Sequence, residues 1–223
     1  MRPPVEPESS NGTGRWRRGQ SSHRVRPVRP THQRSDTLFQ YVFASPFGWM
    51  GLLGGERGLI AVNLGEATEP EAWAALEATT AELGDALADA TVQPAQSARS
   101  LPAAMAEALA TLQAYFRNGQ VDLSTIRVDI RSGTPLQQRI WAATRTIPAG
   151  ETVSYKGLAE RVGLPRGARP TGQAMARNRL LLVVPCHRVV SSSGALTGYS
   201  NPQGLGLKQR LLDHEQAPAV SRR

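Results

Sequence analysis

Cysteine is nearly absent from the sequence. The 223 residues include one, Cys186, so the chain can form no internal disulfide. Disulfides are frequent in small secreted domains and rare in the reducing cytosol, and we therefore expect a cytoplasmic protein. Long apolar runs are missing as well. No stretch approaches the ~18 residues of a membrane-spanning helix, and the first thirty residues lack the apolar segment of a secretory signal. The sequence thus predicts no membrane association.

Negative charge is scarce in the second half of the chain. The formal net charge is +8, and it divides into +6 over residues 1–35, −7 over residues 36–120 and +9 over residues 121–223. An acidic block followed by a basic block favours two domains, with a polyanionic partner facing the second. Sequences rich in arginine and alanine also occur in proteins that bind no nucleic acid, so the charge alone leaves DNA binding open.

Residues 1–35 are rich in proline, arginine, serine and glycine and contain almost no apolar residues. Such a composition cannot form a core and predicts a disordered basic tail. We expect a second disordered tail at residues 217–223. Between the tails we predict two domains, an N-terminal α+β domain over residues 36–122 and a C-terminal domain over residues 123–216.

Three short runs rich in aliphatic and aromatic residues begin the first domain, at residues 38–44, 48–53 and 59–64. Glycine and proline separate them, which is typical of antiparallel strands joined by tight turns. Apolar residues at helical spacing then predict amphipathic helices over residues 68–87 and 105–116, with a loop between them. Three strands and two helices make a small α+β domain, in which we find no candidate catalytic group.

The second domain begins with helix signals. Thr134 precedes Pro135, which is the pattern of a capped helix start. Ser154 can cap a short helix that stops at Gly163, and another helix is expected over residues 169–178. Two short helices joined by a glycine-bearing turn are the helix-turn-helix pattern. Many helix pairs share that pattern, so it does not identify a DNA-binding protein by itself.

Cys186 follows an apolar run at residues 180–184, which has the length of a buried strand. A lone buried cysteine is usually a small hydrophobic residue. Here Pro185 breaks the regular structure and places the sulfur at a turn, beside His187 and Arg188. Cationic or basic neighbours lower the pKa of a thiol into the reactive range. We therefore predict that Cys186 is reactive and that His187 and Arg188 stabilise its thiolate.

The carboxylate partner of His187 is left open by the sequence. A nucleophilic cysteine commonly takes its base from a histidine that a carboxylate orients in turn. The last predicted helix, over residues 205–214, ends near two acidic residues, Asp213 and Glu215. Either can supply the carboxylate, and the spacing does not decide between them.

Several segments resemble the O6-alkylguanine-DNA alkyltransferases. The most specific is Val184-Pro185-Cys186-His187-Arg188-Val189-Val190, and the others are Pro148 to Tyr155, the helix pair through Asn178, Tyr199-Ser200, and Leu211 to Glu215. The likeness is strong over residues 130–215 and loose over residues 38–120. It implies an α+β fold, with an N-terminal ribonuclease-H-like α/β domain and a C-terminal, mostly helical domain that carries a winged-helix-like helix-turn-helix.

Members of this family flip the damaged guanosine out of the duplex, because chemistry on a base requires its removal from the stack. The resemblance implies that Cys186 is the nucleophile and accepts the alkyl group in one displacement. It makes His187 the base, acting through a water, and Glu215 the residue that orients His187. Tyr155 is implied to donate a proton to guanine N3. Water does not readily hydrolyse a thioether, so each molecule is expected to act once.

The same resemblance implies a set of DNA contacts. Arg169 fills the gap left by the extruded base, and Asn178 is a hinge between the helix pair and the active-site loop. The remaining implied contacts are Tyr199 and Ser200 over the pocket, with Ser200 bonding the guanine oxygen, and Lys156 and Ser192 on phosphates. The implied partner is double-stranded DNA containing O6-alkylguanine, approached from the minor groove, where readout is nearly independent of sequence. We expect a monomer with no cofactor and no metal.

The sequence departs from the family pattern before the cysteine, where Arg179, Leu180 and Leu181 stand in place of two usual prolines. This leaves the pocket width, the preferred alkyl group and activity on O4-alkylthymine open. The main alternative function is that of a non-catalytic alkyltransferase-like protein that binds lesions, but such proteins replace the reactive cysteine. A cysteine hydrolase needs an oxyanion hole and gives no reason for Arg169. A DNA-binding regulator needs a dimer surface or a sensor module.

Overall fold

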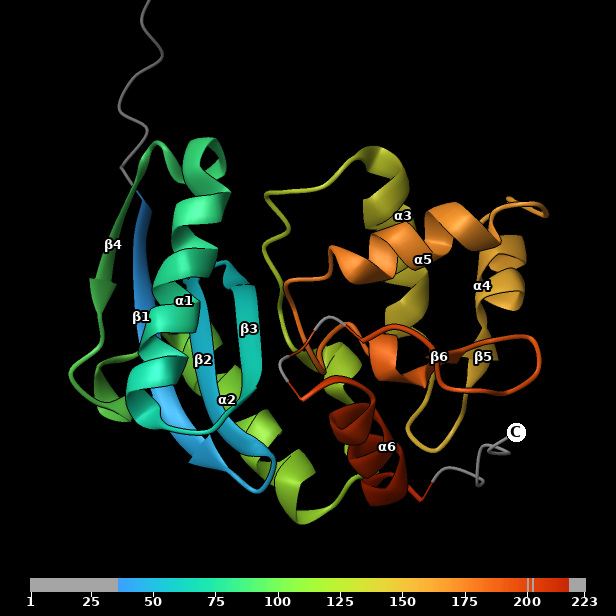
Figure 1. Ribbon diagram of the computed structural model, residues 1–223. Coiled ribbons are helices and arrows are strands. Elements are labelled where there is room, and N and C mark those ends of the chain that lie inside the picture. Colours follow the sequence, from blue (N-terminus) through green and yellow to red (C-terminus); the bar gives the residue numbers. More distant parts are fainter. Residues whose placement is uncertain (1–35, 200, 202, 217–223) are drawn as a thin grey trace, which may run out of the picture. The chain divides into compact units, whose positions relative to one another are not determined.

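Antiparallel strands form where short apolar runs are separated by tight glycine turns. The computed structural model describes residues 36–199, 201 and 203–216. In it β1 (Asp36–Ser45), β2 (Gly48–Gly55) and β3 (Gly58–Glu66) make an antiparallel meander, which confirms the three predicted strands (Figure 1). The predicted tails at residues 1–35 and 217–223, and the predicted contact Ser200, lie outside the described residues.

A fourth strand extends the sheet beyond the predicted meander. β4 (Ala90–Pro94) pairs parallel with β1 and gives the strand order β3-β2-β1-β4. The sequence predicted a loop here, because this segment is short and ends at a proline. An edge strand tolerates both features, since only one of its sides needs ladder hydrogen bonds. The prediction of a loop was wrong for this segment.

Helices cover both faces of the sheet. α1 (Glu69–Leu83) packs on one face, where its Leu76 joins Leu53 of β2 in a core cluster. α2 (Ala103–Arg117) packs on the other face, where its Leu112 joins Leu52 of β2 (Figure 1). Adjacent residues of β2 thus point to opposite faces, as the alternation along a strand requires. Both predicted helices are confirmed.

The second half is mostly helical. Its elements are α3 (Pro135–Arg145), β5 (Val153–Ser154), α4 (Tyr155–Arg161), α5 (Ala168–Ala176), β6 (Val189–Val190) and α6 (Gly204–His214). Thr134 and Gln137 form a capping box at the start of α3, and Ser154 caps α4. The predicted α+β class and the predicted helix pair, α4 and α5, are confirmed. Across the described part of the chain, the helices are too short or too polar to span a membrane.

The two halves share one core. Residues at the free edge of β3 make isolated bridges, Leu59 with Val128 and Val62 with Leu180. One apolar cluster also runs from the sheet into α6, where it includes Leu211. By their contacts the described residues form a single compact unit. The predicted domain boundary after residue 122 stays a prediction.

Candidate active site

The segment before the cysteine is coiled into turns. Leu182 has φ +68°, and the N–H of Val184 donates to the carbonyl of Leu180 at 2.8 Å. The predicted buried strand over residues 180–184 is therefore wrong. A run of apolar residues fits a buried turn as well as a buried strand, because every side chain is buried in both. Cys186 then opens a single 3₁₀ turn, Cys186–Arg188.

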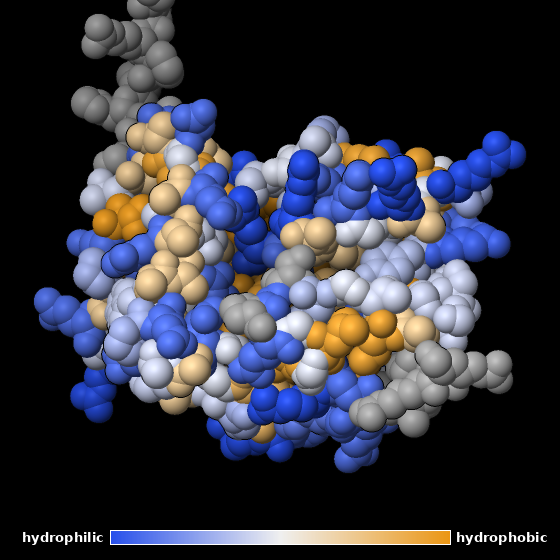
Figure 2. All heavy atoms as spheres, in the orientation of Figure 1, coloured by the Kyte–Doolittle hydropathy of each residue, from blue (hydrophilic) through white to orange (hydrophobic). Residues whose placement is uncertain are grey.

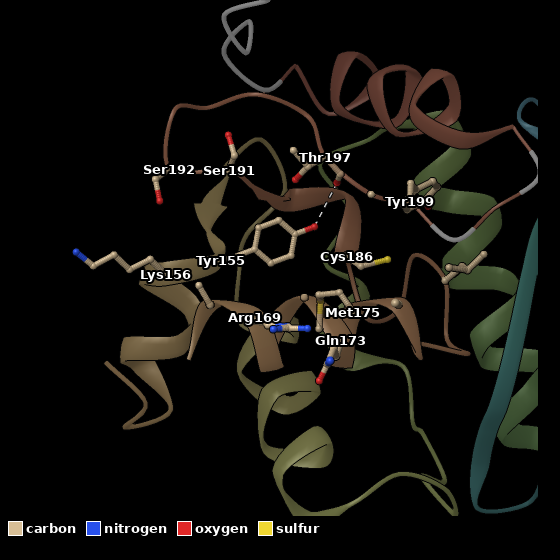
Figure 3. Close-up of a pocket in the computed structure, with 15 residues that line it drawn as sticks. Tyr155, Lys156, Arg169, Gln173, Met175, Cys186, Ser191, Ser192, Thr197 and Tyr199 are labelled. Carbon is tan, nitrogen blue, oxygen red and sulfur yellow. Dashed lines mark hydrogen bonds between the residues drawn. The ribbon is translucent and has the colours of Figure 1, made fainter. Parts of the chain in front are cut away.

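Cys186 lines a pocket of ≈ 610 Å³ between α4, α5 and the segment at residues 191–199 (Figure 3). The pocket brings together the predicted site residues Tyr155, Lys156, Arg169, Ser192 and Tyr199. Cys186 is 5% exposed, so a ligand reaches the sulfur through this pocket. The lining is mostly apolar around a few polar groups, which suits a flat heterocycle whose orientation must be set.

Asn178 holds the sulfur and the chain that leads to it. Its Nδ2 donates to Cys186 Sγ at 3.3 Å and to the Val184 carbonyl at 2.9 Å, while its Oδ1 accepts from the Leu180 N–H at 2.9 Å. The hinge position that the resemblance implied is thus occupied by a side chain with three partners. Because Asn178 follows the end of α5, it links the helix pair to the active-site turn.

The thiol of Cys186 is held protonated at rest. Burial raises the pKa of Cys186, and the hydrogen bond from Asn178, the charge of Lys208 and two backbone N–H groups only partly offset this rise. The prediction that Arg188 stabilises the thiolate was wrong, because the Arg188 guanidinium donates to Glu215 and to the Ile147 carbonyl. A proton must therefore leave the sulfur before or during any attack.

His187, which follows Cys186 in the chain, supplies a neutral imidazole. Its Nε2 lies 2.9 Å from Glu215 Oε1, and both side chains are fully buried. Burial lowers the pKa of His187, and Arg188 and Lys208 lower it further, although Glu215 opposes them. An ionised carboxylate only accepts hydrogen bonds, so Nε2 carries the proton. Nδ1 is left with a free lone pair and has no partner among the described residues, which makes it a proton acceptor.

Glu215 is the carboxylate, and Asp213 is not. Asp213 is exposed and accepts a hydrogen bond from Gln209. Glu215 caps the end of α6, and its Oε2 accepts from Arg188 Nε at 2.9 Å while its Oε1 accepts from Arg188 Nη2 at 2.8 Å. Burial alone would raise the pKa of Glu215, but the bonds from His187 and Arg188 lower it to about 2. The buried carboxylate is therefore ionised at neutral pH.

Lys208 is a buried cation at the site that sequence reasoning missed. Its Nζ donates to the carbonyls of Val189 at 2.7 Å and Thr197 at 3.1 Å, and burial lowers its pKa to about 8. Lys208 lies three and four residues before Leu211 and Leu212, and two turns before Glu215, so it shares the apolar face of its helix. A lysine on an apolar helix face was the signal in the sequence that could have revealed this buried cation. It ties the segment at residues 191–199 to β6.

Tyr155, at the start of α4, meets the same carbonyl. Its hydroxyl donates to Thr197 O at 3.2 Å, and burial raises its pKa. The hydroxyl of Tyr199 is buried and has no hydrogen-bond partner in the described parts of the chain. Both phenols thus stand at the pocket protonated (Figure 3).

The outer residues of the predicted site are exposed. Arg169 is the second residue of α5 and lies at the pocket, and Ser192 lies on the opposite side (Figure 3). Lys156 Nζ is 3.9 Å from Glu160, and both side chains are more than half exposed, so the pairing leaves Lys156 available to other anions. Within the described residues no cluster of histidine, cysteine or acidic side chains is placed to hold a metal.

Comparisons with known proteins identify the family. The family described as 6-O-methylguanine DNA methyltransferase, DNA binding domain, matches residues 135–217. A methylated-DNA–protein-cysteine methyltransferase of Mycolicibacterium paratuberculosis is 44% identical over 131 residues, which are 58% of this chain and 77% of the relative. One of Methanosarcina acetivorans is 32% identical over 183 residues, which are 80% of this chain and 98% of the relative.

A solved structure agrees with these relatives. The crystal structure of Mycobacterium tuberculosis OGT in complex with DNA matches with a TM-score of 0.61 and 33% identity, and the match covers 81% of this chain and 95% of that one. The chain belongs to the methylated-DNA–protein-cysteine methyltransferase family. The resemblance seen in the sequence is confirmed.

Proposed function

We propose that the protein repairs DNA by direct reversal, moving a methyl or larger alkyl group from guanine O6 in DNA to Cys186. The observation that carries this proposal is a single buried thiol in a pocket large enough for a base, followed in the chain by a neutral histidine that a buried carboxylate holds. Curated relatives with this activity in their names support it. An alkyl carbon is a soft electrophile, and sulfur is the suitable nucleophile at neutral pH.

The reaction is one displacement. His187 Nδ1 takes the thiol proton through a water, and Glu215 stabilises the resulting imidazolium. The sulfur attacks the alkyl carbon, the bond between that carbon and O6 breaks, and its electron pair passes to the purine. Tyr155 gives a proton to guanine N3, so the base leaves neutral, and the proton held by His187 balances the one that Tyr155 gave. The thioether persists, and each molecule acts once.

Tyr155 must change partner for this role. In the unliganded protein its hydroxyl donates to the Thr197 carbonyl. Its raised pKa makes the phenol a poor acid toward a neutral purine. Negative charge on the departing guanine makes N3 basic enough to take the proton. Tyr199 and Ser200 are proposed to close over the base, with Ser200 bonding the guanine oxygen.

The partner we propose is double-stranded DNA containing O6-alkylguanine, approached by α5 from the minor groove. Four arginines on and around the helix pair are exposed: Arg161, Arg166, Arg169 and Arg177. Strongly hydrophilic residues gather over α5 (Figure 2). Basic side chains on such a surface neutralise phosphates. Lys156 and Ser192 are proposed as further phosphate contacts.

Finer features of the fold belong to the same proposal. A meander followed by a helix and by a strand parallel to β1 supports a ribonuclease-H-like N-terminal domain. The pair α4 and α5, beside the small sheet of β5 and β6, supports a winged-helix-like second domain. We further propose that the protein is a monomer and acts in the cytoplasm. The alternative of a non-catalytic lesion-binding protein is disfavoured by the buried, histidine-backed Cys186.

Intact mass tests the function. Mixing the protein with a short duplex containing O6-methylguanine should add one methyl group per molecule, and Cys186→Ala should add none. Peptide mapping should place the methyl group on Cys186. Repeated turnover, or a methyl group on another residue, would contradict the proposal. Binding to the lesion duplex with no mass gain would favour the lesion-binding alternative.

Arg169 has a separate test. Arg169→Ala should slow transfer from duplex DNA roughly tenfold, because extruding a base costs a few kcal/mol that the inserted side chain helps to offset. Transfer from the free alkylated base should change little, since no stack has to be opened. Rates are measured by quenched single-turnover assays on both substrates. Arg99→Ala, an exposed arginine far along the chain, is the control. Equal slowing on both substrates would remove Arg169 from this role.

A further inference from the structure

The buried carboxylate of the active site has a fourth donor, which comes from the first half of the chain. The hydroxyl of Tyr115, near the end of α2, donates to Glu215 Oε1 at 2.8 Å. Tyr115 and Glu215 are one hundred positions apart in the sequence, and both are 0% exposed. Oε1 thus accepts from Tyr115, His187 and Arg188 together.

The backbone around this contact is fixed as well. The Tyr115 carbonyl lies 2.8 Å from His214 Nε2, and Gln120 Nε2 donates to the Glu215 carbonyl at 2.7 Å. At Gly119 a Cβ atom would stand 2.3 Å from the His214 carbonyl oxygen, so only glycine permits this approach. The rings of Tyr115 and His214 pack edge to face with centroids 5.2 Å apart. The ends of α2 and α6 are therefore locked together.

We propose that Tyr115 is a positioning residue for the transfer reaction, and that the first half of the chain thereby completes the active site. This inference rests on the proposed function. Tyr115 is not among the residues that line the pocket, and its hydroxyl donates to Glu215, so it acts through Glu215 and His187. The first half, in which the sequence revealed no candidate catalytic group, then supplies one hydrogen bond on which the base depends.

The physical effect follows from the charge on Glu215. A hydroxyl that donates to a carboxylate spreads its negative charge and weakens its pull on the neighbouring imidazole proton. Without that hydroxyl the carboxylate attracts a positive His187 more strongly. The charged or titratable groups facing His187 are Glu215 and Lys208 from α6 and Arg188 beside it. Removing the Tyr115 hydroxyl changes only the charge distribution on Glu215. His187 should then protonate at higher pH and lose its free lone pair.

Tyr115→Phe is the test, because it removes one oxygen and keeps the ring. On the acid limb of the rate–pH profile, where the variant has more protonated His187, the single-turnover rate of methyl transfer from lesion duplex should fall about tenfold, which equals about 1.4 kcal/mol of barrier. The acid limb of the rate–pH profile should move to higher pH. The number of methyl groups accepted per molecule at completion should stay at one, which separates rate from the fraction of folded protein.

Leu112→Val is the matched control, since Leu112 lies one turn earlier on α2, is buried and makes no contact with Glu215 through a polar atom. It should lower the melting temperature and leave the rate and the pH profile unchanged. Tyr115→Phe combined with Glu215→Gln should be no slower than Glu215→Gln alone. A Tyr115→Phe profile that matches the wild type would overturn the inference. A wild-type protein that accepts no methyl group would instead overturn the proposed function.

Discussion

Glu215→Gln should lower the free energy of unfolding by about 3–5 kcal/mol at neutral pH, the usual cost of removing one partner from a buried ion pair. Arg188 is 4% exposed and makes three of its hydrogen bonds to Glu215 and Ile147. A neutral amide leaves its charge buried without a counter-ion and presents N–H groups to other donors. Methyl transfer should slow roughly 100-fold, because His187 loses the group that stabilises its protonated form.

The pH dependence of this loss has a defined sign. The pKa of Glu215 is about 2 in the folded protein against 4.5 ordinarily. A lowered carboxyl pKa contributes stability that is present above the ordinary value and is lost as pH falls through the folded value. The gap in stability between the wild type and Glu215→Gln should therefore narrow between pH 4.5 and 2. Urea unfolding followed by circular dichroism measures it.

Glu77→Gln serves as the control, because Glu77 is an exposed residue of α1 with no ion pair among the described residues. It should shift the free energy of unfolding by less than about 0.5 kcal/mol. If Glu215→Gln were equally mild, Arg188 would have to find another anion or water, and the geometry proposed for His187 would be wrong.

Lys208→Met should make the thiol of Cys186 harder to ionise. The Lys208 charge opposes the rise in the pKa of Cys186 that burial causes, and methionine removes that charge while filling a similar volume. Reaction of the thiol with iodoacetamide, and methyl transfer from lesion duplex, should each slow about tenfold, because a smaller fraction of the thiol is ionised. Arg210→Met, an exposed position on the same helix, should leave thiol reactivity unchanged.

The direction in which stability changes with pH should also reveal that Lys208 is buried. The pKa of Lys208 is about 8 when folded and 10.5 ordinarily. Between these values the unfolded chain binds the extra proton, so the wild type gains stability as pH rises through this window, by about 3 kcal/mol if the site acts alone. Lys208→Met lacks that gain. Compared with the wild type, it should be relatively more stable at pH 7 than at pH 10. The opposite trend would mean that Lys208 is not buried as described.

Local signals predicted most of the fold. Helix caps such as Thr134 and Ser154 and the short apolar runs mark their elements directly, because caps and periodicity are properties of neighbouring residues. The same local patterns failed at β4, where a strand at the sheet edge is short and polar. They failed again at residues 180–184, where the turn depends on Leu182 adopting a positive φ. Contacts with distant parts of the chain determine the backbone conformation of both segments.

The sequence predicted those site residues that are adjacent in the chain or that match the family motif. Cys186 and His187 stand side by side in the sequence, and the resemblance supplied Tyr155, Arg169 and Asn178. Sequence patterns did not reveal Tyr115, because its partner is one hundred positions away and its spacing on α2 is that of an ordinary core residue. Lys208 was missed because the direction of a basic side chain depends on what packs around it.

The Thr197 carbonyl oxygen accepts hydrogen bonds from both the Tyr155 phenol and the Lys208 ammonium. In the proposed reaction Tyr155 gives its proton to the purine and leaves this carbonyl, while Lys208 keeps its own bond to it. Under that proposal, loss of the Tyr155 contact would leave Thr197 fastened to α6, and the acid could move without freeing the segment that borders the pocket.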